Sequence, residues 1–147
     1  MDLSDLISLL ALVLSVISLI ISSRYSSKAN KMAMGSEELQ VRELIWSARN
    51  RVEDLSMKLF NDETKKDNEV FKQSFNSALE GVCNAYDEAC SKYLDGKIDK
   101  SRFKKMYFNE IKNWVENDSV KDKYVEPQTR FHATVAVYNE WNNLEKK

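Results

Sequence analysis

The chain has 147 residues, with 22 basic and 23 acidic side chains, a net charge of −1, two cysteines and one histidine. Charges of both signs are mixed along the chain, which excludes the clustered basic surface expected of a nucleic-acid-binding protein. Three glycines, one proline and no sustained alternation of polar and apolar residues argue against strands. We therefore expect an all-α protein.

The first element is an uncharged apolar run from Leu6 to Ile21. Twelve of its sixteen residues are Leu, Ile or Val, and the others are three serines and one alanine. Extended to Ser23, the run covers about 18 residues and roughly 27 Å as a helix, which matches the hydrocarbon core of a bilayer. The sequence predicts one transmembrane helix within residues 1–23, with the membrane bilayer as a partner.

Charges on the two sides of this run predict its orientation. Asp2 and Asp5 precede it, whereas the basic residues Arg24, Lys28 and Lys31 follow it. Basic flanks stay in the cytoplasm, so we expect a single-pass inner-membrane protein with its N-terminus outside and its C-terminal part in the cytoplasm. A cleaved secretory signal is the alternative, although such a signal opens with basic rather than acidic residues.

Small residues in and beside the apolar run fall on one face of the predicted helix, spaced alternately four and three apart. They are Ser4, Ser8, Ala11, Ser15, Ser18 and Ser22. Such a stripe lets membrane helices approach closely, which predicts a homo-oligomer or a membrane partner. The alternative is that the serines bond to their own helix. The spacing continues through Tyr25, Ala29 and Met32, which predicts a helix that extends towards Gly35.

After the span we expect a juxtamembrane segment, residues 24–35, that is a basic linker or a helix extension, and then a cytoplasmic domain, residues 36–147. Apolar periodicity predicts a compact bundle of about four amphipathic helices in this domain. Their expected ranges are 36–60, 69–94, 99–117 and 127–144. Ser36 and Asp99 are predicted N-caps, Gly96 a C-terminal cap and Pro127 a first-turn proline.

Helical spacing also predicts which residues face the core. In the third helix these include Met106, and in the fourth they are Phe131, Val135, Tyr138, Trp141 and Leu144. Small residues around Gly81 in the second helix predict the close approach of another helix. Trp46 and Phe108 lie off the apolar stripes and are candidates for a partner-binding surface.

No metal site is expected. Gly96 resembles the central glycine of an EF-hand calcium loop, but Ser91, Tyr93 and Arg102 would then occupy positions that need better oxygen ligands. Cys83 and Cys90 are seven residues apart on one predicted helix, roughly 10 Å along its axis and too far for a disulfide. We expect two free thiols and no cofactor.

No catalytic site is expected either. His132 has no partner that its sequence spacing identifies, and we expect it to be a surface or interface residue of the last helix rather than a catalytic base. Asp87 and Glu88 are adjacent, so their side chains point about 100° apart on a helix. This predicts two solvent-exposed carboxylates rather than an acid–base pair.

The order of parts resembles small bacterial membrane proteins of unknown function that have one span and a helical cytoplasmic domain, several of them associated with prophages or phage defence. The resemblance rests on the span, on the basic segment 24–31, and on the stretch 93–99 leading into Phe103 and Tyr107. It implies a setting in phage defence and assigns no functional residue.

Together these features favour a non-enzymatic, membrane-anchored protein that self-associates or binds a protein partner at the cytoplasmic membrane face. The main alternative is a pore-forming effector that assembles through its transmembrane helix and disrupts the membrane. A third reading is an enzyme tethered to the membrane, because helical bundles can hold sites that no sequence motif announces.

Overall fold

The computed structural model describes residues 2–62, 64–65 and 68–145, with the backbone alone for residues 3–7, 9, 144 and 145. These described residues form four α-helices and a short 3-10 helix, and none of them is in a strand. The elements are α1 (Leu3–Asn61), α2 (Glu69–Leu94), α3 (Lys100–Val115), η2 (Lys121–Tyr124) and α4 (His132–Glu145). The predicted all-α fold, with a long apolar N-terminal helix, is confirmed.

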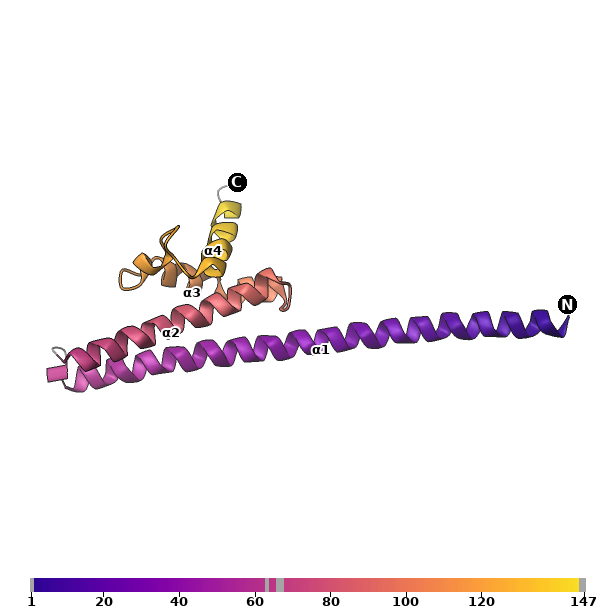
Figure 1. Ribbon diagram of the computed structural model, residues 1–147, viewed down its shortest axis with the longest axis horizontal. Helices are drawn as coiled ribbons and strands as arrows, with labels where there is room; N and C mark the ends of the chain where they lie inside the picture. The colour runs from indigo at the N-terminus through magenta and orange to yellow at the C-terminus, as the bar shows by residue number, and fades with distance from the viewer. Residues whose placement is uncertain (1, 63, 66–67, 146–147) are drawn as a thin grey trace. The chain divides into compact units, whose positions relative to one another are not determined.

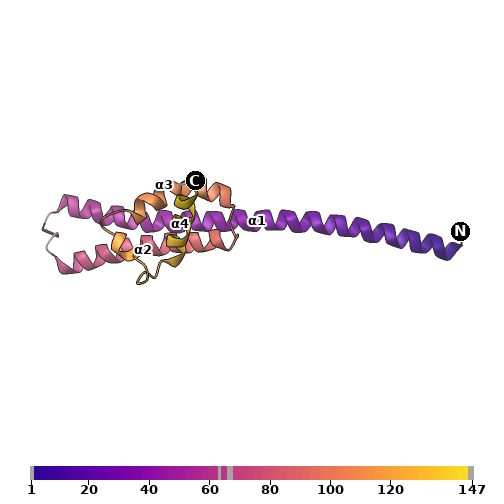
Figure 2. The same ribbon diagram turned by 90° about the horizontal axis from the view of Figure 1, so that it is seen from above.

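The chain forms two compact units that divide between Ser36 and Glu37. The first unit is the N-terminal part of α1, and the second contains the rest of α1 together with α2, α3 and α4. Within the second unit, α1 and α2 run side by side in opposite directions, and α3 and α4 lie on one side of this pair (Figures 1 and 2). This second unit is the helical bundle that the apolar periodicity predicts.

Residues 24–35 are helical, so this segment is a continuation of α1 rather than a linker. Ser36 lies inside the helix, and the predicted N-cap at this position is wrong. Two residues later, the Glu38 carboxylate accepts hydrogen bonds from the Asp99 N–H at 3.1 Å and from the Arg102 guanidinium at 2.7 Å. These bonds tie α1 to the start of α3.

The turn between α2 and α3 has the caps that the sequence predicts. Gly96 has a φ of 69°, a left-handed conformation that glycine adopts without strain. Its N–H donates to the Tyr93 carbonyl at 3.1 Å, and the Lys97 N–H donates to the Lys92 carbonyl at 3.0 Å. These two bonds satisfy carbonyl groups at the end of α2. Asp99 then caps α3, since its carboxylate accepts from the Arg102 N–H at 2.8 Å.

The start of α4 differs from the prediction, because the helix begins at His132 rather than at Pro127. Phe131 is buried in a small core cluster with Tyr124, their ring centroids 5.4 Å apart. The Phe131 N–H donates to the Thr129 hydroxyl at 3.0 Å. These contacts hold the residues up to Phe131 in a non-helical turn. The helix therefore begins at the next residue, His132.

The later start goes with a different buried face. The buried residues of α4 are Thr134, Val137 and Trp141. Val135 and Tyr138, which were predicted to face inward, are only half-buried, and the Leu144 side chain lies outside the described side chains. Because Phe131 is held outside the helix, Trp141 rather than Phe131 sets the orientation of α4.

The core of the second unit is largely aromatic. Trp141 is 1 % exposed, and its ring centroid lies 5.4 Å from that of Tyr93 and 6.0 Å from that of Phe103. From α1 the cluster receives Val41 and Ile45. Met106 was predicted to join it but is exposed, because α3 turns Phe103 and Tyr107 inward instead.

The middle of α2 contains a glycine that no close contact explains. A Cβ atom built on Gly81 would meet no atom within 4 Å, so the predicted close approach of another helix at this residue is wrong. Gly81→Ala should therefore raise the free energy of unfolding by up to about 1 kcal/mol, the difference between the helix propensities of the two residues. Urea unfolding of the full chain in mild detergent, followed by far-UV circular dichroism, measures this change.

Gly96→Ala is the matched control for this prediction. The left-handed conformation of Gly96 costs an alanine about 1–2 kcal/mol, so this variant should lose stability although the space around it is equally open. A loss of stability in Gly81→Ala as well would show that the α2 backbone at Gly81 needs glycine for a reason other than space.

Candidate functional site

The first unit presents an apolar surface that nothing else in the unit covers. Every residue from Leu10 to Ile21 is exposed, and large side chains such as Leu12 and Leu19 expose more than half of their surface. An apolar surface of this length on a single helix is unfavourable in water. The helix is long and apolar enough to span a membrane.

The small-residue stripe lies on this exposed helix. Its members Ser8, Ala11, Ser15, Ser18 and Ser22 are all exposed, whereas the side chain of Ser4 lies outside the described ones. The Ser15 hydroxyl donates to the Ala11 carbonyl at 2.9 Å, so the alternative of a serine bonding to its own helix is realised at this position. The stripe is a face of small side chains. The Ser15 hydroxyl donates its hydrogen bond within the helix and not to a partner helix.

The three basic residues predicted as the topology signal follow on the same helix. Arg24, Lys28 and Lys31 are all exposed. They begin three residues after the last apolar residue of the run, Ile21, and lie at successive turns of α1. Their place on a continuous helix means that no flexible linker separates the positive charge from the apolar surface.

The second unit carries an open groove of about 390 Å³ between α1 and α3. It contains the exposed Trp46, one of the two residues predicted as a partner surface. The other lining residues are Arg42, Ile45, Arg49, Asn50, Glu53, Tyr107 and Glu110. The groove therefore combines a large aromatic side chain with two guanidinium groups and two carboxylates.

The floor of this groove is held by a polar cluster. The Glu110 carboxylate contacts the Arg49 guanidinium at 3.2 Å and accepts a hydrogen bond from the Tyr86 hydroxyl at 3.1 Å. Burial and the adjacent Glu110 carboxylate raise the pKa of Tyr86, and burial raises the pKa of Tyr107. Both phenols stay protonated at neutral pH and are not bases there, and Tyr86 donates its hydroxyl proton to Glu110.

Phe108, the other predicted surface residue, does not share this groove. It is half-buried, its ring centroid lies 5.9 Å from that of Trp141, and the Lys104 ammonium lies 5.6 Å above it. Phe108 thus covers the edge of the aromatic core beside α4. The structure places Trp46 and Phe108 against different neighbours, so they form no common surface.

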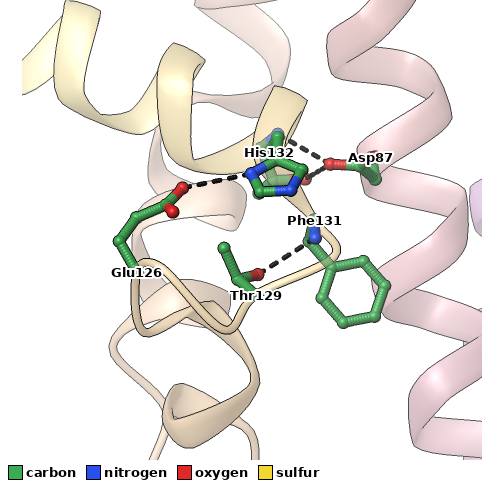
Figure 3. A network of polar contacts seen from close by, with 6 residues as sticks. Asp87, Glu126, Thr129, Phe131 and His132 are labelled. Atoms are coloured by element: carbon green, nitrogen blue, oxygen red, sulfur yellow. Dashed lines mark hydrogen bonds and ion pairs between the residues drawn. The ribbon is translucent and has the colours of Figure 1, made fainter.

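Asp87 has a role that the sequence did not predict (Figure 3). Its carboxylate accepts hydrogen bonds from the Thr134 N–H at 2.9 Å and from the Thr134 hydroxyl at 3.1 Å. Thr134 lies in the first turn of α4, where N–H groups have no partner within the helix. Asp87 of α2 therefore caps α4, and the expectation that it is solvent-exposed is wrong, whereas Glu88 is exposed as expected.

His132, the other candidate for acid–base chemistry, lies at the surface at the start of α4. Its Nδ1 atom is 3.3 Å from the Glu126 carboxylate (Figure 3). Both side chains are at least half exposed, so water competes for this contact. The pair does not line the groove between α1 and α3.

The two cysteines are free and fully buried. Burial raises the pKa of Cys90 to about 12, so its thiol is protonated at neutral pH and is a poor nucleophile. Among the residues that the structure describes, no three His, Cys, Asp or Glu side chains lie close enough to hold a metal ion. The described surfaces open to other molecules are the exposed apolar part of α1 and the groove that contains Trp46, two arginines and two glutamates.

Comparison with known protein families, curated proteins and solved structures found no match for this chain.

Proposed function

We propose that this chain is a non-enzymatic, single-pass membrane protein whose helical second unit acts at the cytoplasmic face of the membrane through contacts with proteins, its own copies included. The observation that carries the proposal is the uncovered apolar surface of α1 from Leu10 to Ile21. In a bilayer each Leu, Ile or Val of this run contributes about −0.3 to −0.6 kcal/mol to insertion.

The basic residues after the run support the orientation. Arg24, Lys28 and Lys31 are exposed on the helix directly after the apolar surface, and basic residues in this position are retained in the cytoplasm. The second unit is then cytoplasmic, where its two buried cysteines stay reduced.

The groove between α1 and α3 supports a role in binding rather than in catalysis. Tryptophan and arginine are the residues that contribute most often to protein interfaces, and here Trp46 lies between Arg42 and Arg49 in an open groove. Anchoring to a membrane raises the effective concentration of the domain for partners at the same surface, so moderate affinities suffice.

Extraction of membranes at alkaline pH tests the anchor. The full chain should stay in the membrane pellet, and Leu14→Lys/Ile17→Arg should release it, because each charge at the centre of a span costs about 2.5–3.5 kcal/mol. Leu39→Lys/Leu44→Arg is the matched control: it makes the same changes at exposed residues of α1 outside the apolar run and should leave the protein in the pellet.

Protease digestion of intact spheroplasts and of inverted membrane vesicles tests the orientation. The second unit should be cleaved only in inverted vesicles. Recovery of the unmodified chain in the soluble fraction would contradict the anchor, and cleavage in intact spheroplasts would contradict the cytoplasmic placement.

A further inference from the structure

The groove between α1 and α3 contains an exposed tryptophan between two arginines. Arg42, Trp46 and Arg49 lie on successive turns of α1, spaced four and three residues apart, so their side chains leave the helix on one side. Trp46 is 65 % exposed, whereas Trp141 is buried and Trp114 is half-buried. An indole that stays exposed inside a groove offers a flat face on which another aromatic ring can stack.

Two charged side chains of this groove have no partner of opposite charge. Arg49 is paired with Glu110, whose carboxylate also accepts a hydrogen bond from Tyr86. Arg42 and Glu53, by contrast, form no ion pair with any residue that the structure describes. The groove therefore offers a ligand one unpaired cation and one unpaired carboxylate, both on the same helix.

The two unpaired charges lie on either side of the indole along α1. Arg42 precedes Glu53 by about three turns, or about 16 Å along the helix axis, and Trp46 lies between them. At about 100° per residue, the two charged positions differ by only about 20° around the axis, so both lie on the side of the helix that carries the indole. A molecule on the indole therefore has a cation at one end and a carboxylate at the other.

Tyr107 of α3 lines the groove beside Arg42. Burial raises the pKa of the Tyr107 phenol, and the nearby Arg42 guanidinium opposes this rise. The phenol is uncharged at neutral pH, so it does not neutralise the guanidinium. Arg42 thus keeps its positive charge for a ligand, and a guanidinium binds phosphate through two parallel N–H donors.

We propose that this groove binds a guanine mononucleotide, with the base stacked on Trp46, the phosphate on Arg42 and the edge of the base towards Glu53. Nucleic-acid bases stack on aromatic side chains, and every base has such a face. Guanine also carries two neighbouring N–H donors on one edge, which a single carboxylate can accept together, whereas adenine carries only an amino group there. One phosphate matches the one unpaired arginine, and it needs no basic surface of the kind that a nucleic acid requires.

The size and place of the groove agree with a small ligand. Its volume of about 390 Å³ lies within the roughly 300–1,000 Å³ of small-molecule sites. All the residues that line it belong to the second unit. Binding of a nucleotide here goes beyond the proposed function and depends neither on the membrane anchor nor on a protein partner, so its absence would leave that function standing.

Isothermal titration calorimetry of the full chain in mild detergent tests the site with a nucleotide and its parts. Guanosine 5′-monophosphate should bind about tenfold or more tightly than guanosine, which lacks the phosphate, and than ribose 5-phosphate, which lacks the base, because stacking and a charged hydrogen bond each change affinity by about this much. It should also bind more tightly than adenosine 5′-monophosphate. Equal binding of ribose 5-phosphate would show an anion site only, and that result, or no binding of guanosine 5′-monophosphate, would overturn the proposal.

Single substitutions assign the parts of the nucleotide to residues. Arg42→Gln should weaken guanosine 5′-monophosphate by about tenfold and leave guanosine unchanged, whereas Trp46→Ala should weaken both. Glu53→Gln should remove most of the preference for guanosine 5′-monophosphate over adenosine 5′-monophosphate. Stacking should also quench the tryptophan fluorescence of the chain, and Trp46→Phe should lose this quenching while it keeps binding.

Arg51→Gln is the matched control. Arg51 is an exposed arginine of α1 that does not line the groove, so this variant should bind the nucleotide as the unmodified chain does. Arg42, Trp46 and Glu53 are exposed as well, so all these variants should keep the far-UV circular dichroism of the unmodified chain. Equal losses in Arg51→Gln and Arg42→Gln, or unchanged binding in Trp46→Ala, would contradict the site. Equal affinity for a peptide of alternating tyrosine and glutamate would show a protein-binding groove and overturn the nucleotide as its ligand.

Discussion

Replacement of Trp141 by alanine is expected to lower the free energy of unfolding of the helical bundle by about 3–5 kcal/mol. The side chain is 1 % exposed and lies among Tyr93, Phe103 and Phe108, with ring centroids between 5.4 and 6.0 Å away. Its Nε1–H donates to the Tyr93 hydroxyl at 3.1 Å. The truncation removes buried aromatic surface, leaves a cavity and takes a hydrogen-bond donor from Tyr93.

A loss of this size is a large part of the total stability of a small domain, which is about 5–15 kcal/mol. Urea unfolding of the full chain in mild detergent, followed by far-UV circular dichroism, measures it. Trp141→Phe keeps an aromatic ring and should lose much less, so a value is obtained even if the alanine variant does not fold.

Met106→Ala is the control for burial. Met106 was predicted to face the core but is 44 % exposed, and its truncation should change the free energy of unfolding by about 0.5 kcal/mol or less. Equal losses for Met106→Ala and Trp141→Ala would show that α3 and α4 are packed differently from the structure described here.

Asp87→Ala is expected to cost about 2–3 kcal/mol, more than an ordinary surface substitution. The Asp87 carboxylate accepts two hydrogen bonds from Thr134, whose side chain is fully buried. Without Asp87, the first turn of α4 loses its cap, and the Thr134 N–H and hydroxyl lose their acceptor away from water. The loss should appear as a lower midpoint of thermal unfolding, measured by circular dichroism.

The neighbouring carboxylate supplies the control for this prediction. Glu88 is exposed and contacts Lys92 at 3.6 Å, so Glu88→Ala should change stability by about 0.5 kcal/mol or less. Combining Asp87→Ala with Thr134→Val separates the effect of the hydroxyl bond from that of the N–H bond. Additive losses from the two changes would contradict the hydrogen bond between the Thr134 hydroxyl and the Asp87 carboxylate.

Much of the fold follows from local sequence. The apolar run from Leu6 to Ile21 predicts the exposed N-terminal helix, because its length and composition are those of a helix that can span a membrane. The bounds of α2 and the caps at Gly96 and Asp99 were also predictable, since a glycine at a helix end and an aspartate at a helix start act on backbone groups within a few residues.

The candidate surfaces were only partly predictable. The groove that contains Trp46 is lined by residues of both α1 and α3, and no local pattern brings these two helices together. Trp46 was identified because it lies off the apolar stripe. Phe108 met the same criterion, yet it packs against Trp141 from a different helix, a contact that no local pattern contains.

By itself, the sequence determined the helical class, the apolar N-terminal helix, the basic segment after it and the ends of α2, because each depends on residues within one or two turns of the chain. Only the tertiary structure decided the start of α4 and the role of Asp87. Phe131 is held by a core cluster that includes Tyr124, and the cap of α4 comes from a residue 47 positions earlier in the chain. Such interactions depend on which helices meet, and local periodicity carries no information about that.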